Sequence, residues 1–244
     1  MEWRDEGLVI GVRRHGEHSA IVEAMTRSHG RHLGLVRGGR SKRLAAALQP
    51  GNSLGLVWRA RLDEHLGAYA IEPLNLRAGR LMESALALAG VNYLAALARL
   101  LPEREPHEAV YEALALIADR LDDAATAPPL VARFEAQILV ECGFRLDLSR
   151  CAATGTSEGL AYVSPRSGRA VSLAAGAPWR DRLLPLPAFL RAGAPLEALP
   201  SAEEIADAFR TTGFFLLRDL FATRGEPLPD SRRAFLVAAK TSSG

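Results

Sequence analysis

The stretch LVRGGRSKRLAAALQPGNSLGLVWRARLDEHLGAYAIEPL, residues Leu35 to Leu74, decides the fold of the first part of this chain. It begins at the end of an aliphatic strand, passes through a basic turn and a short alanine-rich helix, and continues as two strand-like runs, Ser53–Ala60 and Leu66–Ile71. Two more such runs precede it, Leu8–Val12 and Ser19–Thr26. Five short strands with a small helix after the third predict a closed barrel of the OB type, with an SH3-like barrel as the main alternative.

After Leu74 the sequence becomes rich in alanine and leucine at helical spacing. The expected helices cover about Gly79–Leu101, a segment after Pro106, about Leu130–Cys142 with Pro128 and Pro129 in its first turn, a long segment that begins at the capping box of Ser201 and Glu204, and a last segment from about Asp230. The fold class is therefore α+β. We expect a barrel over residues 1–75 and a helical domain over residues 76–244.

The composition is that of a soluble protein with a sizeable core, since 48% of the residues are hydrophobic and 24% are charged. Two cysteines do not make a disulfide framework and indicate a reducing compartment. The N-terminus has no basic segment followed by a long apolar run, so no signal peptide is expected. The most apolar run, Ser84–Leu101, contains Asn92 and Arg99, which favours a buried helix over a membrane span.

Charge is distributed unevenly along the chain, although the net charge is only +2. Residues 1–80 carry 13 Lys and Arg against 8 Asp and Glu, residues 81–160 carry 6 against 12, and residues 161–244 carry 11 against 8. Five of the six histidines also fall in the first 80 residues. The basic first part predicts either a surface for an anion, most often a nucleic acid, or a solvated basic surface.

The sharpest local motif is RGGRSKR, Arg37–Arg43, with four basic residues and two glycines. Glycines allow a backbone to approach a ligand closely, and arginines bind phosphate oxygens through paired donors. The order Arg-Ser-Lys does not match the phosphate-binding loop of nucleotide hydrolases. Such a loop on a small barrel is typical of single-strand binding. Further cations on or beside other strands are Arg13, Arg14, Arg59 and Arg61. Trp58 points away from Arg59 and Arg61 and is expected in the core.

Other polar clusters have simpler interpretations. His15 and His18 lack the spacing of a helical zinc site, and a polar hairpin turn explains them better. The acidic residues Asp119, Asp122 and Asp123 at a helix end are expected on a solvated face. No catalytic arrangement has a recognisable context, which favours a binding protein over an enzyme.

Three segments resemble the bacterial recombination mediator family RecO. The first is Leu35–Leu74, with its basic glycine-containing turn, its helix closing in Leu-Gln-Pro and its strand of alternating basic residues. The opening GLVIGVRRHGEHSAIVEAMTRSHGRHLGLVRG fits the same pattern, and FEAQILVECGFRLDLSRCAATG, Phe134–Gly155, matches a family segment in which a helix ends before a cysteine turn. The resemblance weakens after about residue 175.

The resemblance explains the segment at about 147–175. Many RecO proteins carry a four-cysteine zinc ribbon there, but in this chain the first pair is reduced to Cys151 and Thr154, and the second pair falls near Ser164 and Ser172. One thiolate does not complete the tetrahedral site of structural zinc. We therefore expect a degenerate, metal-free ribbon-like insert.

The resemblance implies a DNA repair and homologous recombination mediator rather than an enzyme. Such proteins bind single- and double-stranded DNA, anneal complementary strands, bind the acidic C-terminal tail of the single-stranded DNA-binding protein SSB and, with RecR, help to load RecA onto SSB-coated DNA. They use no cofactor and no membrane, and they act in the bacterial cytoplasm near the nucleoid. An OB-fold protein acting in RNA handling is the alternative function, and an enzyme built on the N-terminal histidines is a more remote one.

The expected DNA-binding residues are Arg13, Arg14, Arg37, Arg40, Lys42, Arg43, Arg59 and Arg61. For the rim of a groove that accepts the SSB tail, we expect Arg133 at the start of the third long helix. No catalytic residue and no metal ligand is expected.

Overall fold

The computed structural model describes residues 1–144, 146–195 and 199–242. The chain forms two compact units, one made of residues 1–124 with the C-terminal helix from Ser231, the other of residues 125–230. The elements of the first unit are β1 (Glu2–His15), β2 (Ser19–Thr26), β3 (Gly30–Val36), α1 (Lys42–Ala47), β4 (Ser53–Arg59), β5 (Ala68–Asn75), α2 (Ala78–Met82), α3 (Ala85–Ala98), α4 (Glu108–Ala118) and α8 (Asp230–Ser242).

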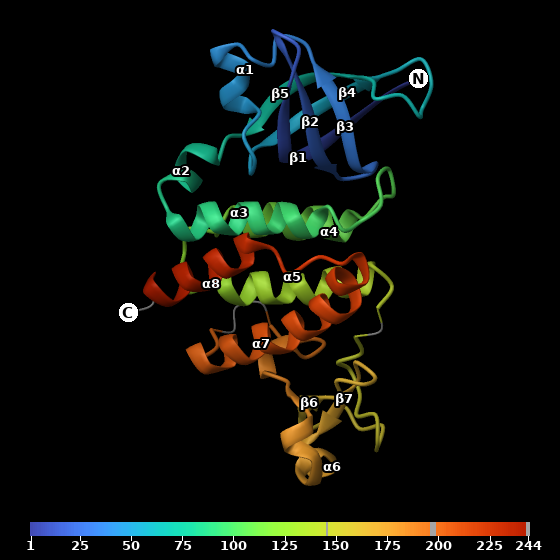
Figure 1. Ribbon diagram of the computed structural model, residues 1–244, viewed down its shortest axis with the longest axis vertical. Helices are drawn as coiled ribbons and strands as arrows, with labels where there is room; N and C mark the ends of the chain where they lie inside the picture. The colour runs from blue at the N-terminus through green and yellow to red at the C-terminus, as the bar shows by residue number, and fades with distance from the viewer. Residues whose placement is uncertain (145, 196–198, 243–244) are drawn as a thin grey trace. The chain divides into compact units, whose positions relative to one another are not determined.

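Strands β1 to β5 close into a barrel in the order β1-β2-β3-β5-β4 (Figure 1). The long strand β1 pairs with β4 along its first half and with β2 along its second half, and a bulge between Val9 and Gly11 interrupts its register with β2. Strands β3 and β5 pair in parallel through Leu35 and Ala68. The predicted order of five strands with a helix after the third is present.

The barrel interior is filled by alternating residues of the strands and by an aromatic cluster. Trp58 is 0% exposed, and its indole N–H donates to the carbonyl of Leu66 at 3.0 Å, which confirms the expectation of a core residue. The ring of Trp3 stacks on Trp58 with 5.6 Å between centroids. Gly34 leaves the space that the ring of Tyr69 occupies, because a Cβ there would lie 2.3 Å from Tyr69 Cδ2.

The first predicted helix, Gly79–Leu101, is wrong as a single element. Ser84 adopts an extended backbone, and its hydroxyl accepts a hydrogen bond from the amide of Ala87, so α2 ends and α3 begins at this cap. Helix α3 packs closely on α8, since a Cβ on Gly90 would lie 3.3 Å from the ring of Phe235. Helix α4 buries Val110, Leu114 and Ile117 as its spacing predicted.

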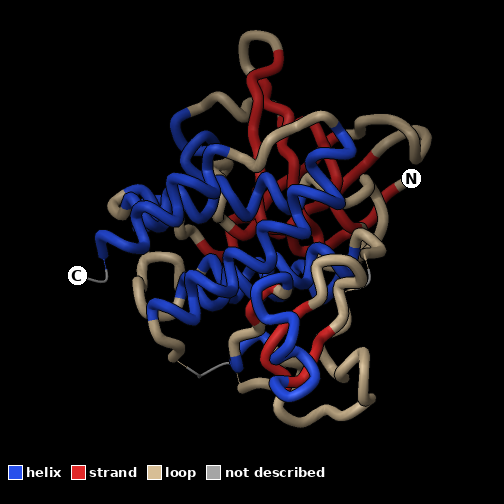
Figure 2. Tube along the Cα trace, turned by 60° about the horizontal axis from the view of Figure 1, so that its bottom comes forward, coloured by secondary structure: helices blue, strands red, loops and turns tan. Residues whose placement is uncertain are grey.

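The second unit combines two long helices with a small sheet (Figures 1 and 2). Its elements are α5 (Ala127–Glu141), β6 (Leu160–Val163), β7 (Ala170–Ser172), α6 (Leu173–Gly176), the 3-10 helix η1 (Ala177–Arg182), β8 (Leu184–Pro185), the 3-10 helix η2 (Ala188–Leu190), α7 (Ala202–Phe215), the π-helix η3 (Leu216–Phe221) and the 3-10 helix η4 (Ala222–Arg224). Helices α5 and α7 are joined by a buried hydrogen bond from the Thr212 hydroxyl to the Glu135 carboxylate. The predicted prolines in the first turn of α5 and the capping box at Ser201 are both confirmed.

The predicted insert contains β6 and β7, which form a three-stranded sheet with the later strand β8 in the order β7-β6-β8. Cys151 is buried beside this sheet, where the amide of Ser172 donates to its sulfur at 3.2 Å. Burial alone raises the pKa of the Cys151 thiol, but hydrogen bonds from Ser172, Thr154 and the amide of Ala153 outweigh it and lower the pKa to about 6. Ser164 lies at the other end of β6, where it pairs with Arg169. The structure therefore brings two of the three predicted hydroxyl residues to the cysteine.

The compact units do not divide at residue 75, where the sequence predicts the domain boundary. Helices α2 to α4 and α8 belong to the same unit as the barrel. The arginines that cap α2 and α3 bind barrel strands, and α8 packs on α3. Arg99 of the α3 C-cap donates to the carbonyl of Ile10 at 2.8 Å, and Arg77 donates to the Ser53 hydroxyl at 2.7 Å. Within the described residues, no helix combines the length and apolar composition that a membrane crossing requires.

Arg77 provides a test of how the barrel is joined to these helices. Its side chain is buried, and it donates to Ser53, to the carbonyl of Gly51 and to the carboxylate of Asp119. We expect Arg77→Leu to lower the free energy of unfolding by about 2 kcal/mol at pH 7, because buried charge-assisted hydrogen bonds are lost. Denaturant unfolding measures the effect, and Arg120→Leu on the exposed end of α4 is the control.

The same pair predicts a pH dependence. The hydrogen bond from Arg77 holds the pKa of Asp119 below its ordinary value. The stabilisation is therefore complete above the unfolded-state pKa of about 3.9, and it is lost as the pH falls through the lower folded-state pKa. The difference between wild type and Arg77→Leu should shrink below about pH 4. A difference that stays constant down to pH 2 contradicts the ion pair.

Candidate nucleic-acid interface on the barrel

The basic residues of the first 80 positions fall into a paired group and an unpaired group. The ion pairs with the helices and with β2 are Arg27 with Glu108 and Glu112, Arg31 with Glu23 and Glu103, Arg77 with Asp119, and Arg80 with Asp122. Asp119 and Asp122 are exposed, as expected of a solvated face, but both carboxylates also bind arginines. The acidic middle of the chain therefore neutralises part of the basic excess of its first part.

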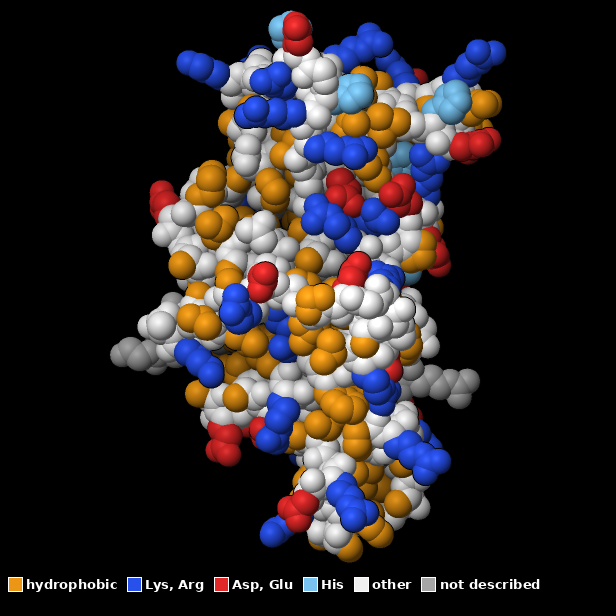
Figure 3. Space-filling model, viewed as in Figure 1, with side chains coloured by type: hydrophobic (Ala, Val, Ile, Leu, Met, Phe, Trp, Pro, Cys, Tyr) orange, Lys and Arg blue, Asp and Glu red, His pale blue; other side chains and the backbone are white. Residues whose placement is uncertain are grey.

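The unpaired group is exposed on the barrel. Within the described ranges, the cations without a hydrogen bond or ion pair in this part of the chain are Arg4, Arg13, Arg14, Arg37, Lys42, Arg43 and Arg61. Figure 3 shows Lys and Arg side chains gathered over the barrel, at the top of the view. Apart from Arg4, these are residues that the sequence predicted as phosphate contacts.

Most of the unpaired cations come from two adjacent segments, the β1–β2 hairpin and the loop from β3 to α1. Arg14 lies opposite Ala20 in the hairpin, and Ala20 lies opposite Val36 at the end of β3. The loop cations that follow Val36 therefore lie beside the hairpin cations. Lys42 and Arg43 occupy the first turn of α1, after the N-cap Ser41. The helix dipole disfavours cations there, so this placement suits an anion outside the protein.

Arg40 differs from the other loop cations, because its guanidinium already has partners. It donates to the carbonyls of Glu17 at 2.6 Å and Gly16 at 3.3 Å, and the Arg40 amide donates to the carbonyl of His18 at 3.1 Å. These three bonds attach the loop to the tip of the β1–β2 hairpin. The geometry therefore gives Arg40 a positioning role, although the sequence predicted a phosphate contact.

A hollow of about 360 Å³ lies between the hairpin, the loop and α1. Its lining combines the apolar Val12, Ala45 and Leu48 with the guanidinium of Arg14. A surface of this kind offers an apolar recess for a base or sugar beside a phosphate contact.

Arg59 and Arg61 extend the cationic surface along the sheet. The register links Arg13, Ile21, Leu35, Ala68 and Arg59 in one row across neighbouring strands. Four strand spacings separate Arg13 from Arg59, which is roughly 19 Å along the sheet. Arg59 is bound to Glu2 at 2.8 and 3.1 Å, a contact that lowers the pKa of Glu2, whereas Arg61 has no partner among the described residues.

Arg4 is the unpaired cation that sequence reasoning missed. It alternates with Glu2 and Glu6 on the exposed face of β1. The available signal was the period-two alternation of charge in the first six residues, which indicates a strand that starts at Glu2 rather than at Leu8.

The N-terminal histidines do not form a common site. His15 and His18 are exposed in the hairpin, as the sequence predicted. His29 stacks on Trp3 at 4.1 Å and hydrogen-bonds Asp5 at 2.8 Å. His32 is buried in the aromatic cluster, and burial lowers its pKa to about 4. Among the residues that the structure describes, no group of three His, Cys, Asp or Glu side chains is arranged to hold a metal ion.

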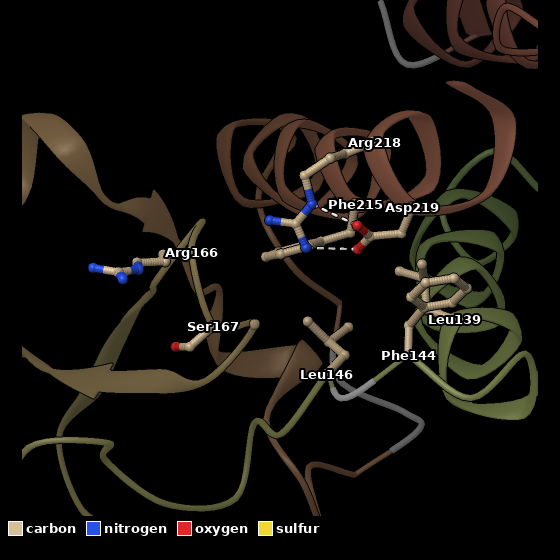
Figure 4. A pocket seen from close by; sticks show the side chains of 9 residues that line it. Leu139, Phe144, Leu146, Arg166, Ser167, Phe215, Arg218 and Asp219 are labelled. Atoms are coloured by element: carbon tan, nitrogen blue, oxygen red, sulfur yellow. Dashed lines mark hydrogen bonds and ion pairs between the residues drawn. The ribbon is translucent and has the colours of Figure 1, made fainter. Parts of the chain in front are cut away.

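A second candidate surface lies in the other unit, between α5, the turn from β6 to β7, and the π-helix η3. A pocket of about 100 Å³ adjoins a shallower hollow of about 700 Å³, and Phe144, Leu146 and Ser167 line both. In Figure 4, Leu139 and Phe144 form one wall, and Arg218 faces them with its guanidinium bound to Asp219 at 2.5 and 2.7 Å. The wider turn of a π-helix carries Arg218, a geometry that is frequent at functional sites.

The cations at this pocket are not equivalent. Arg218 is neutralised by Asp219, and it also donates to the carbonyl of Pro165. Arg169 lies 3.8 Å from Asp147. Arg166 is exposed and has no partner in the part of the chain that the structure describes. Arg166 is therefore unengaged at the rim, and Arg169 beside it has only the long, exposed contact with Asp147.

Arg133, which the sequence predicted as the rim of a partner groove, is engaged elsewhere. Its guanidinium donates to the carbonyls of Ala194 at 3.1 Å and Pro195 at 2.6 Å and lies over the ring of Phe189. These contacts hold the segment that follows η2. Nothing in the sequence signals this use, because the three contacts lie more than 50 residues away along the chain.

Two family models of recombination proteins match the chain, and their limits differ from those of the two compact units. Residues 1–76 match the family described as Recombination protein O N terminal, and residues 82–225 match Recombination protein O C terminal. The class is therefore a recombination protein whose N-terminal barrel is followed by a mainly helical region.

Relatives cover nearly the whole chain. A protein from Methylocella silvestris named DNA repair protein RecO is 64% identical over 97% of this chain and 95% of its own length. Proteins of the same name from Mesorhizobium japonicum and Chelativorans are 60% and 59% identical, each over 98% of this chain and over 94% and 95% of their own lengths. The chain belongs to the RecO family of DNA repair proteins.

The role of Arg40 is testable without DNA. We expect Arg40→Ala to lower the free energy of unfolding by about 1 kcal/mol and to speed amide hydrogen exchange in residues 37–41, because the loop loses two hydrogen bonds to the hairpin. Arg43→Ala removes the same charge from the next element and should change neither quantity. Equal exchange rates in the two variants contradict the positioning role.

Proposed function

We propose that this chain is a recombination mediator and not an enzyme: it binds single- and double-stranded DNA, anneals complementary strands and, with RecR, helps to load RecA onto SSB-coated single-stranded DNA. Membership of the RecO family supports the coarse assignment to DNA repair. The observation that carries the finer proposal is the group of exposed, unpaired cations on the barrel, since a folded protein gains little stability from cations that bind nothing. Activity on chromosomal DNA implies association with the nucleoid.

The barrel is proposed to be of the OB type. Its strand order, with β1 paired to both β2 and β4 and a helix between β3 and β4, supports this assignment. OB barrels use a cationic groove to follow the backbone of a single strand. Arg37, Lys42 and Arg43 would bind phosphates, and Arg13, Arg14 and Arg61 would extend the path. Contacts of this kind do not depend on sequence.

The insert is proposed to be a degenerate ribbon that keeps its fold without metal. Support comes from Cys151, whose sulfur takes hydrogen bonds from Ser172 and Thr154 where a family ribbon has further thiolates. Donors of this kind satisfy one buried sulfur without a cation.

The acidic tail of SSB is proposed to bind in the pocket beside η3. The tail is acidic and ends in apolar residues, so it needs an apolar recess with a cationic rim. Leu139, Phe144 and Phe215 offer the recess. Arg166 and Arg169 offer the rim, in place of Arg133, because the guanidinium of Arg133 is bound to backbone carbonyls.

DNA binding is tested by the variant Arg37→Ala/Lys42→Ala/Arg43→Ala. We expect weaker binding to labelled oligo-dT, and a plot of log affinity against log salt concentration that is shallower by about 2, because three phosphate contacts each release about 0.7 counterions. Fluorescence anisotropy across a salt series measures both quantities.

The matched control is Arg120→Ala/Arg210→Ala/Lys240→Ala, which removes the same charge from exposed positions in the turn after α4, in α7 and in α8. An unchanged slope in the loop variant rules out the phosphate contacts. A strong preference for RNA over DNA of equal length would favour the RNA-handling alternative, because only a reader of the 2′-hydroxyl makes that distinction.

The pocket is tested with a synthetic acidic peptide that ends in apolar residues and a free carboxylate. We expect Arg166→Ala/Arg169→Ala to weaken peptide binding about tenfold, because the peptide's carboxylates lose their cationic partners. Arg133→Ala should leave the affinity unchanged and instead lower thermal stability. If Arg133→Ala alone abolishes peptide binding, the pocket assignment is wrong and the original rim residue is right. Isothermal titration calorimetry measures the affinity.

A further inference from the structure

The segment formed by α6 and η1, called the tip below, exposes a tryptophan. Trp179 in η1 is 57% exposed, and Leu173 in α6 is 58% exposed. The other two tryptophans differ, since Trp3 and Trp58 are packed together in the barrel. The guanidinium of Arg182 lies over the Trp179 ring, 5.8 Å from its centroid. An exposed indole beside an arginine provides a stacking surface with a cation at its edge.

The fold holds this tip in a defined position. The Ser172 hydroxyl accepts from the amide of Ala175 and caps α6 directly after β7. Gly176 lies against Tyr162 of β6, where a Cβ would be 2.4 Å from Tyr162 Cδ2. The chain then enters η1 through Pro178. Trp179 therefore follows directly after a packed segment, while the residues of η1 itself are exposed.

The charges around the ring indicate the class of ligand. Arg180 and Arg182 follow Trp179 in η1, and both are exposed. Asp181 lies 3.6 Å from Arg180, but it is 91% exposed and leaves Arg182 to the ring. A purely apolar partner gains nothing from an arginine over the indole. A single nucleic-acid strand uses both groups, because its bases stack on aromatic rings and its phosphates bind arginine.

We propose that Trp179, Arg180 and Arg182 of this tip form a second contact for single-stranded nucleic acid, with Trp179 stacking on a base and the arginines binding the adjacent phosphates. This contact belongs to a different compact unit from the barrel. It is independent of the barrel cations, so it stands or falls separately from the proposed barrel function. A protein with two strand contacts can hold two complementary strands or two parts of one strand.

The test uses the full chain and oligo-dT. Intrinsic fluorescence is recorded for wild type and for Trp179→Phe, and the difference between them isolates the signal of Trp179. We expect oligo-dT to quench this difference signal, because a stacked base quenches the indole. Trp179→Ala should lower the affinity for oligo-dT at least about fivefold, the low end for the loss of one base stack, and Trp179→Phe should restore most of it.

Two further variants make the outcome decisive. In the Arg37→Ala/Lys42→Ala/Arg43→Ala background, the remaining oligo-dT binding should depend on Trp179. Leu173→Ala removes an equally exposed apolar side chain from the same tip and should leave the affinity unchanged. If oligo-dT binds by anisotropy without quenching Trp179, the tip contact is wrong and the barrel proposal stands. If Trp179 is quenched while the barrel variant binds as wild type does, the tip contact stands and the barrel proposal fails.

Discussion

The carboxylate of Glu23 lies between the guanidinium groups of Arg31 and Arg99, at 2.8 Å from each. This arrangement joins strands β2 and β3 to the end of α3, and the side chains of Glu23 and Arg31 are largely buried. A charge that leaves water is stable only when it is paired and hydrogen-bonded. Every arginine that the helices cover must therefore meet a carboxylate or a carbonyl, while an arginine on the open side of the barrel need not.

Because of this constraint, the basic residues of the first part of the chain have two different roles. The acidic excess of residues 81–160 lies largely on elements that face the barrel, where Glu103, Glu108 and Asp119 bind arginines. Some basic residues of the first 80 positions thus form ion pairs between the barrel and the helices, and the others are exposed without a partner. Charge counts alone do not distinguish the paired from the exposed basic residues, because this depends on which side chains the helices cover. The two interpretations left open by composition, an anion surface and a solvated one, apply only to the cations that remain.

Short sequence patterns predicted most of the helices and strands. The contacts between segments that are distant in the sequence could not be predicted. The five strands, the capping box at Ser201 and the burial of Trp58 follow from patterns within a few residues. The break at Ser84 was missed because the alanine- and leucine-rich spacing continues across it. For the candidate site, the basic loop and hairpin could be located from composition and turn residues. The separate roles of Arg40 and Arg133 could not, because each binds carbonyls of a distant segment.

Arg40 has a consequence for the kinetics of binding. A loop that must fold around its ligand contributes an ordering step, which slows association and reduces affinity by the entropy of the frozen residues. Here the carbonyls of Gly16 and Glu17 already hold the guanidinium, and the loop lies against the hairpin before any ligand arrives. The neighbouring cations are thereby presented on a preformed template. The association rate with a polyanion is then set by diffusion and long-range attraction, and not by ordering of the loop. This rate should therefore depend strongly on ionic strength.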